Sequence, residues 1–234
     1  MNSGRAKTII VLQARMGSRR LPGKALATIG QRSLLGHAVV RLRQPDIAPV
    51  IVATTTEPAD DAVDAEARRH GAQVLRGPRD HVLERVILLA REVGATKIIR
   101  ATADNPAVDG QAAERVLASL ERGRADYAVE YGLPYGCAVE AVTVAALEQA
   151  LACSPDAYDH EHVTSFVVRN ADRFRVVKLL APSAVRRPDL RFTVDTREDL
   201  LYMREVFAAA DNQALPGLLR AADRVGRLSE LGAA

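Results

Sequence analysis

Short apolar runs alternate with segments of helical periodicity through the first half of the chain. Within the runs apolar residues are consecutive, whereas between them they recur every three or four residues, as on one face of a helix. The predicted strands are Thr8–Leu12, Val50–Thr54, Gln73–Leu75 and Lys97–Arg100, and the predicted helices lie around residues 34–42, 62–67 and 82–90. This alternation predicts an α/β fold with a mainly parallel sheet, in which ligands bind beyond the carboxyl ends of the strands.

The pattern is less regular in the second half. Helices are predicted at Gln111–Leu120 and Val142–Ala152, on either side of a Gly/Pro/Tyr-rich stretch, Glu130–Gly136. Further along, the pattern predicts strands at Arg175–Leu179 and Arg191–Val194, a helix at Glu198–Ala209 and a terminal helix from Pro216. We therefore expect one domain over residues 1–234, with a small, partly β insertion at about 130–180 that serves as a lid and dimerisation element.

Composition excludes several classes of protein. With 234 residues, 48% hydrophobic and 26% charged, the chain can bury a large core and is not a disordered protein. No stretch reaches the roughly 20 apolar residues of a membrane span, and the first apolar run is too short for a signal peptide. Cys137 and Cys153 are the only cysteines, so no zinc-type spacing exists. We expect a cytoplasmic protein with no membrane partner.

The charge of the chain favours a small anionic ligand. The net charge is +3 and the sequence pI about 9.1, but aromatic residues make up only 4%, tryptophan is absent, and the basic residues are scattered. A nucleic-acid partner is therefore not expected. The densest basic cluster, Arg15, Arg19, Arg20 and Lys24, lies directly after the first predicted strand and matches the size of one triphosphate.

The loop that holds this cluster runs from Gln13 to Lys24. Gly17 and Gly23 allow backbone conformations in which amides approach an anion. Five residues separate the two glycines and Ala25 stands where a Walker A loop requires Ser or Thr, so the loop is not a Walker A motif; a dinucleotide fingerprint is also missing. The alternative is a solvated basic loop without a ligand.

Two aspartates each follow an apolar, strand-like run. They are Asp104, in ATADNP, and Asp195, in FTVDT. Carboxylates at the carboxyl edge of a sheet suit Mg²⁺, which takes one or two protein carboxylates together with phosphate oxygens and water. The alternative for both is a helix N-cap.

The loop sequence QARMGSRRLPGK resembles the signature of the cytidylyltransferases that activate sugar acids, including the octulosonate and acylneuraminate enzymes. The blocks VATTTEPADD, RGPRDHVLER, IRATADNP, YDHEHVT and LRFTVDTREDL resemble the spore-coat-polysaccharide branch, and together the blocks extend from about residue 8 to residue 201. The resemblance implies a nucleotide-diphospho-sugar-transferase-like (Rossmann-like) three-layer fold, CTP as donor and Mg²⁺ as cofactor.

The resemblance also assigns roles on the nucleotide side. It implies that Arg20 and Lys24 contact the triphosphate, with Lys24 near the α-phosphate, and that Asp104 and Asp195 bind the metal. The residues expected around the nucleotide are Gln13, Ala14, Arg15, Gly17, Ser18, Ala53, Thr54, Arg76, Asp80 and Thr102. For Asp80 a helix N-cap is an equal alternative, and for Arg76 a solvent-exposed position.

On the acceptor side, the expected residues are Arg100, Tyr135, Glu140, His162 and Arg191. The alternative is a solvent-exposed position for Arg100 and Glu140, and a structural or solvated histidine for His162. Spore-coat relatives typically have an aspartate before the glycine of the 133–140 loop and another shortly after it, whereas this chain has Tyr135, Cys137 and Ala138 there. We therefore expect an acceptor with fewer hydroxyls than a nine-carbon sugar acid. Its anionic group would be bound by Arg100 and Arg191 through paired hydrogen bonds.

These observations predict a cytidylyltransferase that joins CMP to an acidic small molecule and releases pyrophosphate. Attack on an α-phosphorus needs mainly charge neutralisation, which a basic loop and a metal supply. The alternatives are a nucleotidyltransferase that uses another base such as GTP, and a non-catalytic nucleotide-binding protein. A metal-dependent glycosyltransferase ranks lower, because no Asp-x-Asp motif follows a predicted strand. We expect a homodimer.

Overall fold

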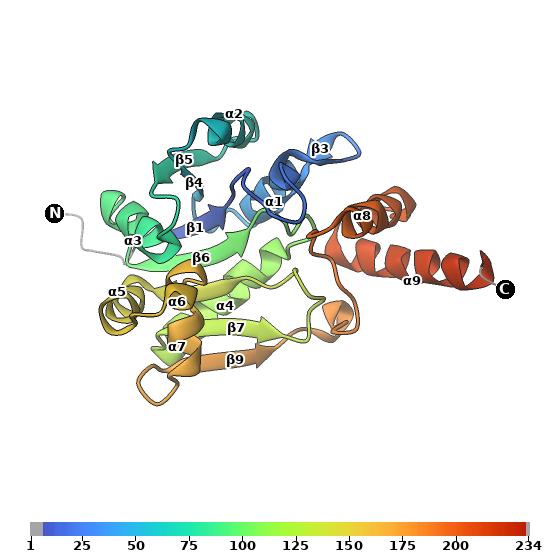
Figure 1. Cartoon of the computed structure of the whole chain (residues 1–234). Helices are drawn as coiled ribbons and strands as arrows, with labels where there is room; N and C mark the ends of the chain where they lie inside the picture. Colours follow the sequence, from blue (N-terminus) through green and yellow to red (C-terminus); the bar gives the residue numbers. More distant parts are fainter. Residues whose placement is uncertain (1–6, 233–234) are drawn as a thin grey trace.

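A seven-stranded sheet forms the centre of the molecule (Figure 1). The computed structural model describes residues 7–232, with side chains up to residue 226. Along the sheet the strands are β5 (Gln73–Gly77), β4 (Val50–Thr55), β1 (Thr8–Gln13), β6 (Lys97–Thr102), β8 (Glu140–Thr143), β7 (Tyr127–Tyr131) and β9 (Val176–Leu180). A small separate ribbon pairs β2 (Thr28–Ile29) with β3 (Arg32–Ser33).

All strands of the central sheet are parallel except β8, which runs antiparallel to both of its neighbours. The mainly parallel sheet expected from the sequence is therefore confirmed. Because β1, β4, β5 and β6 point the same way, the loops that follow them gather at one edge of the sheet. The segment 130–180 adds β8 and β9 to the same sheet.

Helices cover both faces, which gives the expected three layers. One face carries α1 (Leu34–Arg43), α2 (Asp61–Arg69), α4 (Gly110–Gly123), α8 (Arg197–Ala209) and α9 (Leu215–Gly232). The other carries α3 (Val82–Glu92), α5 (Val144–Cys153) and α7 (Ser165–Arg169), with the short α6 (Ala157–Glu161) beside α3. Three short 3₁₀ turns lie at Lys24–Leu26, Pro58–Asp60 and Ser183–Val185.

Strand β1 shows how the core is divided between these layers. Ile10 and Leu12 pack in the first cluster, while Ile9 and Val11 pack in the second, because successive side chains of a strand point to opposite faces. All four are fully buried. This double burial explains the consecutive apolar residues in the first half of the sequence.

Three boundaries in the second half differ from the prediction. The predicted helix Val142–Ala152 begins with two residues of β8, and α5 starts only after Thr143, whose side chain accepts a hydrogen bond from the Ala146 amide as an N-cap. The stretch Glu130–Gly136 begins inside β7, a strand that was not predicted. The segment Arg191–Val194 is not a strand, since only a single bridge joins Arg191 to Tyr135.

Of the helices in the described part of the chain, none is long and apolar enough to cross a membrane.

Candidate active site

A cleft of about 720 Å³ opens at the carboxyl edge of the parallel strands. Most of the predicted site residues line it, namely Gln13, Ala14, Arg15, Gly17, Ser18, Arg20, Lys24, Asp80, Arg100, Thr102, Asp104, His162 and Asp195. A smaller hollow of about 490 Å³ lies at the opposite edge, between residues 43 and 73, and contains none of them. The residues brought together by the fold therefore define one site.

The buried carboxylate of Asp60 holds the start of the loop that follows β1. Asp60 is 2% exposed; its Oδ1 accepts from the Met16 amide at 2.7 Å, and its Oδ2 accepts from the Thr55 hydroxyl. Asp60 thus ties the loop to the end of β4. A charged acceptor buried in this way strengthens both hydrogen bonds, which fixes the start of the loop.

The loop then folds around the Met16 carbonyl, which accepts from the amides of Ser18 at 2.8 Å and Gly23 at 3.0 Å. Gly23 has φ +72°, a left-handed conformation that glycine adopts without strain. Gly17 needs no such freedom, because its φ is not in that region and an added Cβ would meet only the Arg79 guanidinium at 4.0 Å. That the Gly17 amide approaches an anion stays a prediction.

Four loop amides have no hydrogen-bond acceptor in the protein. Within the part of the chain that the structure describes, the backbone N–H groups of Arg15, Gly17, Arg19 and Arg20 donate no hydrogen bond. The Ser18 amide is already used, and its hydroxyl accepts from the Leu21 amide at 3.4 Å. Unpaired amides in a loop flanked by arginines form a concave anion-binding surface.

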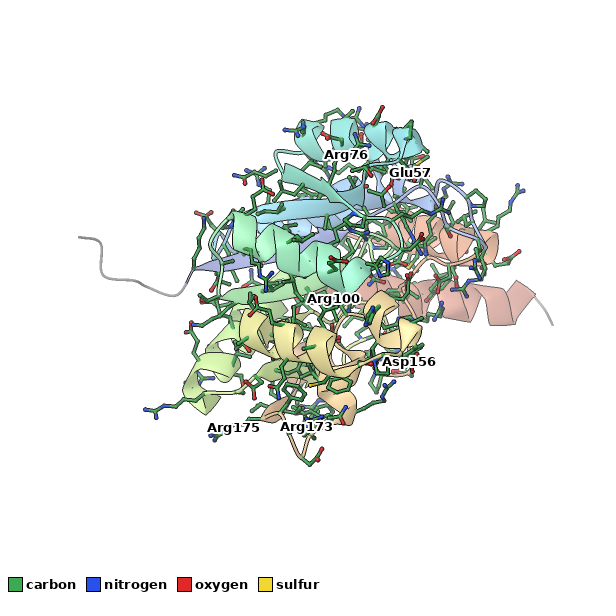
Figure 2. The ribbon with its side chains drawn as sticks, turned by 60° about the vertical axis from the view of Figure 1, so that its left-hand side comes forward. Glu57, Arg76, Arg100, Asp156, Arg173 and Arg175 are labelled. Atoms are coloured by element: carbon green, nitrogen blue, oxygen red, sulfur yellow. The ribbon has the colours of Figure 1, made fainter. Side chains whose placement is uncertain are left out.

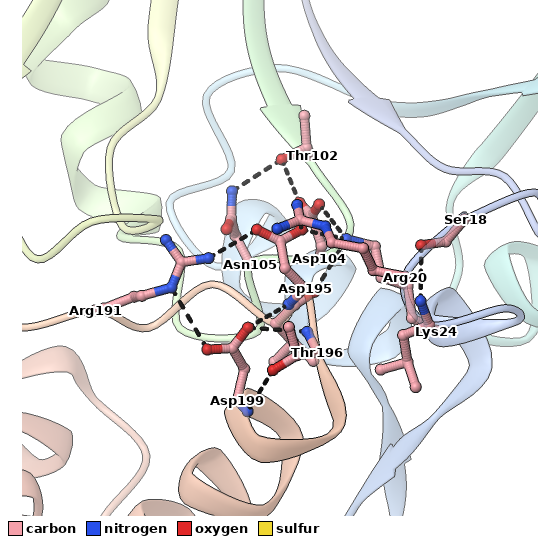
Figure 3. A network of polar contacts seen from close by, with 12 residues as sticks. Ser18, Arg20, Lys24, Thr102, Asp104, Asn105, Arg191, Asp195, Thr196 and Asp199 are labelled. Atoms are coloured by element: carbon pink, nitrogen blue, oxygen red, sulfur yellow. Dashed lines mark hydrogen bonds and ion pairs between the residues drawn. The ribbon is translucent and has the colours of Figure 1, made fainter.

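Lys24 lies between the two predicted metal ligands (Figure 3). Its Nζ donates to Asp104 Oδ2 at 2.7 Å, to Asp195 Oδ1 at 2.9 Å and to the Val194 carbonyl at 3.0 Å. Its side chain is only 14% exposed. The fold therefore brings residues 24, 104 and 195 into contact across large separations in sequence.

Asp195 is bound by two further cations. Arg20 Nη2 lies 2.9 Å from Oδ1, and Arg191 Nη2 donates to Oδ2 at 2.7 Å. Burial alone would raise the pKa of the Asp195 carboxyl, but Lys24, Arg20 and Arg191 outweigh it and hold that pKa below its usual range. Asp195 therefore stays ionised and can bind a cation.

Neither aspartate is a helix cap. The N-cap of α8 is Thr196, which forms a capping box with Asp199, and the N-cap of α4 is Asp109. Asp104 lies in a turn after β6 and accepts from the Thr102 hydroxyl at 2.6 Å. The alternative that both aspartates are caps is thereby removed.

The donor set at this point fits a divalent cation held jointly with a nucleotide. Two carboxylates face one positively charged nitrogen, and carboxylate oxygens are the ligands Mg²⁺ prefers. No group of three or more His, Cys, Asp or Glu side chains suited to a metal occurs among residues 7–226. Two protein ligands leave most of an octahedral shell to water and phosphate oxygens.

The opposite wall of the cleft comes from the second half of the chain. Glu161, at the end of α6, forms an ion pair with Arg15 at 2.8 Å, and this contact joins the wall to the loop. His162 follows directly and its ring lies 4.2 Å from the Tyr158 ring. In the same wall Arg100 is held by Gln13 and Glu140, each at 2.7 Å.

Three predicted nucleotide residues do not line the cleft. Arg76 donates to the Thr55 and Glu57 carbonyls and pairs with Asp61, and Figure 2 shows Arg76 and Glu57 near α2, well away from Arg100. Ala53 and Thr54 are fully buried in β4. Ala53 acts indirectly, since its carbonyl accepts from the Ala14 amide at 3.3 Å.

Three predicted acceptor residues also lie outside the cleft. Tyr135 is 64% exposed, with the Arg191 guanidinium 4.9 Å above its ring. Arg191 is paired with Asp195 and Asp199, so paired hydrogen bonds to an acceptor would require it to leave them. Glu140 lies behind Arg100. Cys137 is fully buried, and burial raises the pKa of its thiol, so it belongs to the core.

The cleft also contains residues that the sequence analysis did not single out, among them Arg79 and Val82 at the start of α3. Asp80, beside them, is not the N-cap of that helix. His81 holds that position and Asp80 is 83% exposed. Arg85 is buried and donates to the Pro78 and Arg79 carbonyls, so it shapes the turn into α3. The Gly77–Pro78 pair before these residues marks a turn at the strand end and was the available signal.

The family model described as cytidylyltransferase matches residues 9–222. The spore coat polysaccharide biosynthesis protein SpsF of Bacillus subtilis is 34% identical over 210 residues, which cover 86% of this chain and 87% of that protein. A cytidylyltransferase structure from Leptospira borgpetersenii is 26% identical with a TM-score of 0.88, and covers 95% of this chain and 96% of that one.

Two more distant structures share the fold. A CMP:2-keto-3-deoxy-manno-octonic acid synthetase complexed with CTP has a TM-score of 0.66 at 20% identity, over 87% of this chain and 99% of that one. A Mycobacterium tuberculosis protein in complex with manganese has a TM-score of 0.61 at 21% identity, over 86% and 99%. The matched family model and the relative of nearly full coverage agree with the loop signature, and the chain therefore belongs to the cytidylyltransferase family of CTP-dependent nucleotidyltransferases.

Proposed function

We propose that this chain transfers CMP from CTP to an acidic small molecule, with Mg²⁺ as its metal. An acceptor oxygen attacks the α-phosphorus, the bond to the β-phosphate oxygen breaks, and pyrophosphate leaves. The observation that supports this most directly is Lys24, whose ammonium lies between Asp104 and Asp195 beside the open loop amides. Two carboxylates and a cation of the same cleft thus support a site for a triphosphate and its metal.

The charge of the cleft supports a triphosphate donor. Seven basic side chains and four acidic ones line it, so a net positive charge faces the ligand. Arg19, the cation at the tip of the loop, is exposed and has no ion pair or hydrogen bond among the described residues. A polyanion bound here exchanges water for charge-assisted hydrogen bonds, which are about twice as strong as neutral ones.

Asp104 and Asp195 would hold the divalent cation. Both now accept hydrogen bonds from Lys24, and these bonds have to change when the cation binds. When bound, the cation neutralises charge on the phosphates and on the departing pyrophosphate. Because Lys24 Nζ occupies the space between both carboxylates, it has to give up at least one of these bonds first. Its ammonium is then free to contact the α-phosphate, where negative charge develops in the transition state.

The manganese and CTP complexes of the two distant structures agree with a divalent metal and a CTP donor. The positive charge of Arg100 in the cleft favours an acid as the acceptor. That the chain acts in the cytoplasm, and pairs with a second copy through residues 130–180, stays a prediction.

A pyrophosphate-release screen tests the proposal. The purified protein is incubated with Mg²⁺ and each of CTP, GTP, ATP and UTP against sugar acids, sugar phosphates, phosphonates and the matching neutral alcohols. We expect release with CTP and at least one acid, and none with the neutral analogue of that acid. Release only with GTP would overturn the choice of base, and nucleotide binding without release would identify a non-catalytic protein.

A further inference from the structure

The guanidinium of Arg100 is oriented by two fixed acceptors (Figure 2 places the residue between α3 and α6). Its Nε donates to Gln13 Oε1 at 2.7 Å and its Nη1 to Glu140 Oε2 at 2.7 Å. Its third nitrogen, Nη2, has no hydrogen-bond partner among the described residues and is not buried. The side chain lines the cleft and is 18% exposed. Arg100 therefore offers one nitrogen to a ligand.

Glu140 is occupied entirely by the protein. Besides Arg100, its Oε2 accepts from the Thr164 hydroxyl at 3.0 Å, and its Oε1 accepts from the Tyr127 hydroxyl at 2.8 Å. Tyr127 and Thr164 are 3% and 4% exposed. Burial raises the pKa of the Tyr127 phenol, and the Glu140 charge adds to it, so this hydroxyl keeps its proton and goes on donating. Both oxygens of Glu140 therefore already accept hydrogen bonds from the protein.

A strained turn joins this carboxylate to the cleft surface. Val163 has φ +39°, an unfavourable conformation for a β-branched residue, and its side chain is fully buried in the α3/α5/α7 cluster. On one side of it His162 lines the cleft, and on the other Thr164 reaches Glu140. Strain of this kind persists only where the surrounding packing imposes it, and it concentrates at functional sites.

The position of Arg100 along the sheet separates it from the loop cations. Arg100 lies inside β6, two residues before its end at Thr102, whereas Asp104 lies in the turn beyond that end. Its supporting residues Glu140, Tyr127 and Thr164 come from the second half of the chain, whereas Lys24 and the open amides belong to the loop. The cleft thus has two separate cationic regions.

We propose that Arg100 binds the anionic group of the acceptor through Nη2 alone, and that Glu140 is the positioning residue that presents it. This rests on the proposed function, which supplies the acidic acceptor. Acceptors fixed at two different nitrogens of a planar guanidinium set its rotation, so the free nitrogen points in one direction. Gln13 occupies Nε, so the paired hydrogen bonds that Nε and Nη2 would make together are not available, and the contact to the acceptor runs through Nη2.

Steady-state kinetics with the acceptor found in the screen separates the two substrates. Arg100→Ala is expected to raise the KM of the acceptor about tenfold, the loss of one charge-assisted hydrogen bond, and to leave the KM of CTP nearly unchanged. Glu140→Gln is expected to raise the acceptor KM by a smaller factor. In the Arg100→Ala background Glu140→Gln has no further effect, because a positioning residue acts only through its partner. Independent, multiplying effects, or a rise in the KM of CTP instead, would overturn the proposal.

A binding experiment keeps the inference testable if no CMP transfer is found. Methylphosphonate is titrated into arginine-labelled protein, and the Arg100 Nε–Hε signal, identified by its loss in Arg100→Ala, is followed by NMR. We expect a saturable shift in the wild type and weaker binding in Glu140→Gln, by less than the about tenfold loss expected for removal of the Arg100 contact. Failure of the pyrophosphate screen with this shift present would reject only the proposed reaction.

Two further variants control for structural damage. Tyr127→Phe removes one donor to Glu140 but keeps the ion pair, so methylphosphonate binding stays as in the wild type. Gln13→Ala removes the other acceptor of Arg100 without leaving a buried charge, so it is informative if Glu140→Gln does not fold, and it is expected to weaken methylphosphonate binding. Wild-type binding in Gln13→Ala and Glu140→Gln, or no shift of the Arg100 signal in the wild type, would contradict the proposal.

Discussion

The cleft contains two groups of ion pairs that differ in how they are held. Around Lys24, two carboxylates share three cations, and Arg20 and Arg191 are largely exposed, at 64% and 44%. Around Arg100, one carboxylate is surrounded by buried donors from β7 and from the turn before α7. The exposed pairs of Arg20 and Arg191 rearrange at little cost, whereas removing a buried donor from a satisfied carboxylate is expensive. The central pairs, Lys24–Asp195 and Arg100–Glu140, are shielded to a similar degree, so the two groups differ in the donors around them.

This difference suggests that the Lys24 group and the Arg100 group have different tasks in the cleft. The Lys24 group has to exchange partners, because a triphosphate and its cation bind to the groups that now neutralise one another. The Arg100 group has to stay in place, because a small acceptor is recognised only by a cation that points in a fixed direction. Variants that remove a partner should therefore change turnover and metal binding in the first group, and acceptor affinity in the second.

The largest expected effect is that of Lys24→Ala. Turnover should fall about 10²–10³-fold, as when one donor to developing charge is removed, while the dissociation constant of CTP changes much less. Single-turnover kinetics and equilibrium binding measure the two quantities. Arg19→Ala is the matched control, because it removes an exposed cation of the same loop and should reduce turnover far less. Equal effects of the two variants would remove the special role of Lys24.

Metal binding gives the next largest effect. Mg²⁺ should bind much more tightly with CTP present than without, by a coupling of about 5–150-fold, because phosphate oxygens complete its shell. Calorimetry should show that Asp104→Asn removes this coupling. Lys24→Met should strengthen Mn²⁺ binding to the nucleotide-free protein, since the two carboxylates then lack their ammonium. Unchanged Mn²⁺ affinity in that variant would argue against exchange between lysine and metal.

Replacement of Asp60, which holds the start of the loop, is expected to have an intermediate effect. Asp60→Asn leaves the Thr55 hydroxyl without its carboxylate acceptor and should lower the free energy of unfolding by about 1–3 kcal/mol. It should also raise the KM of CTP, because the Met16 amide is held less firmly. Asp61→Asn, whose side chain is 69% exposed, should change stability by less than about 0.5 kcal/mol. Denaturant titrations compare the two neighbours, and similar losses would show that Asp60 is not an anchor.

The smallest effect is a pH dependence of the Lys24 group. The pKa of Asp195 is lower in the folded protein than in the unfolded chain, so its contribution to stability is fully present above the unfolded value, about 3.9. It is lost as the pH falls through the folded pKa. The difference in unfolding free energy between the wild type and Asp195→Asn should be constant from pH 5 to 7 and shrink below about pH 4. A difference that grows in acid would contradict the pairing.

The first half of the fold, which supplies the loop from Gln13 to Lys24, could be predicted from the sequence. Strands β1, β4 and β6 are buried on both faces, so their apolar runs are continuous and bounded by turns. The contact between Lys24 and Asp104 was predictable in outline, because loops that follow parallel strands share one edge. Asp195 follows a segment that joins no sheet, so its place was not predictable on this ground.

The second half of the fold, which supplies Glu140 and its donors beside Arg100, could not be predicted in the same way. Ala141, Val142 and Val144 form one apolar run that crosses the junction of β8 and α5, and only the N-cap Thr143 marks the boundary. Phe192 and Val194 alternate as in a strand and are fully buried, yet their segment crosses loops and joins no sheet. The pairing of Arg100 with Glu140 arises from the antiparallel register of β6 and β8, which no local pattern encodes.

The fate of labelled phosphate tests the proposed reaction most directly. CTP labelled at the α-phosphate and CTP labelled at the γ-phosphate are each incubated with Mg²⁺, the protein and the acidic acceptor. Attack at the α-phosphorus predicts that the α label moves into the acceptor as a CMP conjugate while the γ label leaves as pyrophosphate, and that Lys24→Ala slows both. Appearance of the γ label as orthophosphate, with the α label remaining in CDP, would contradict the account.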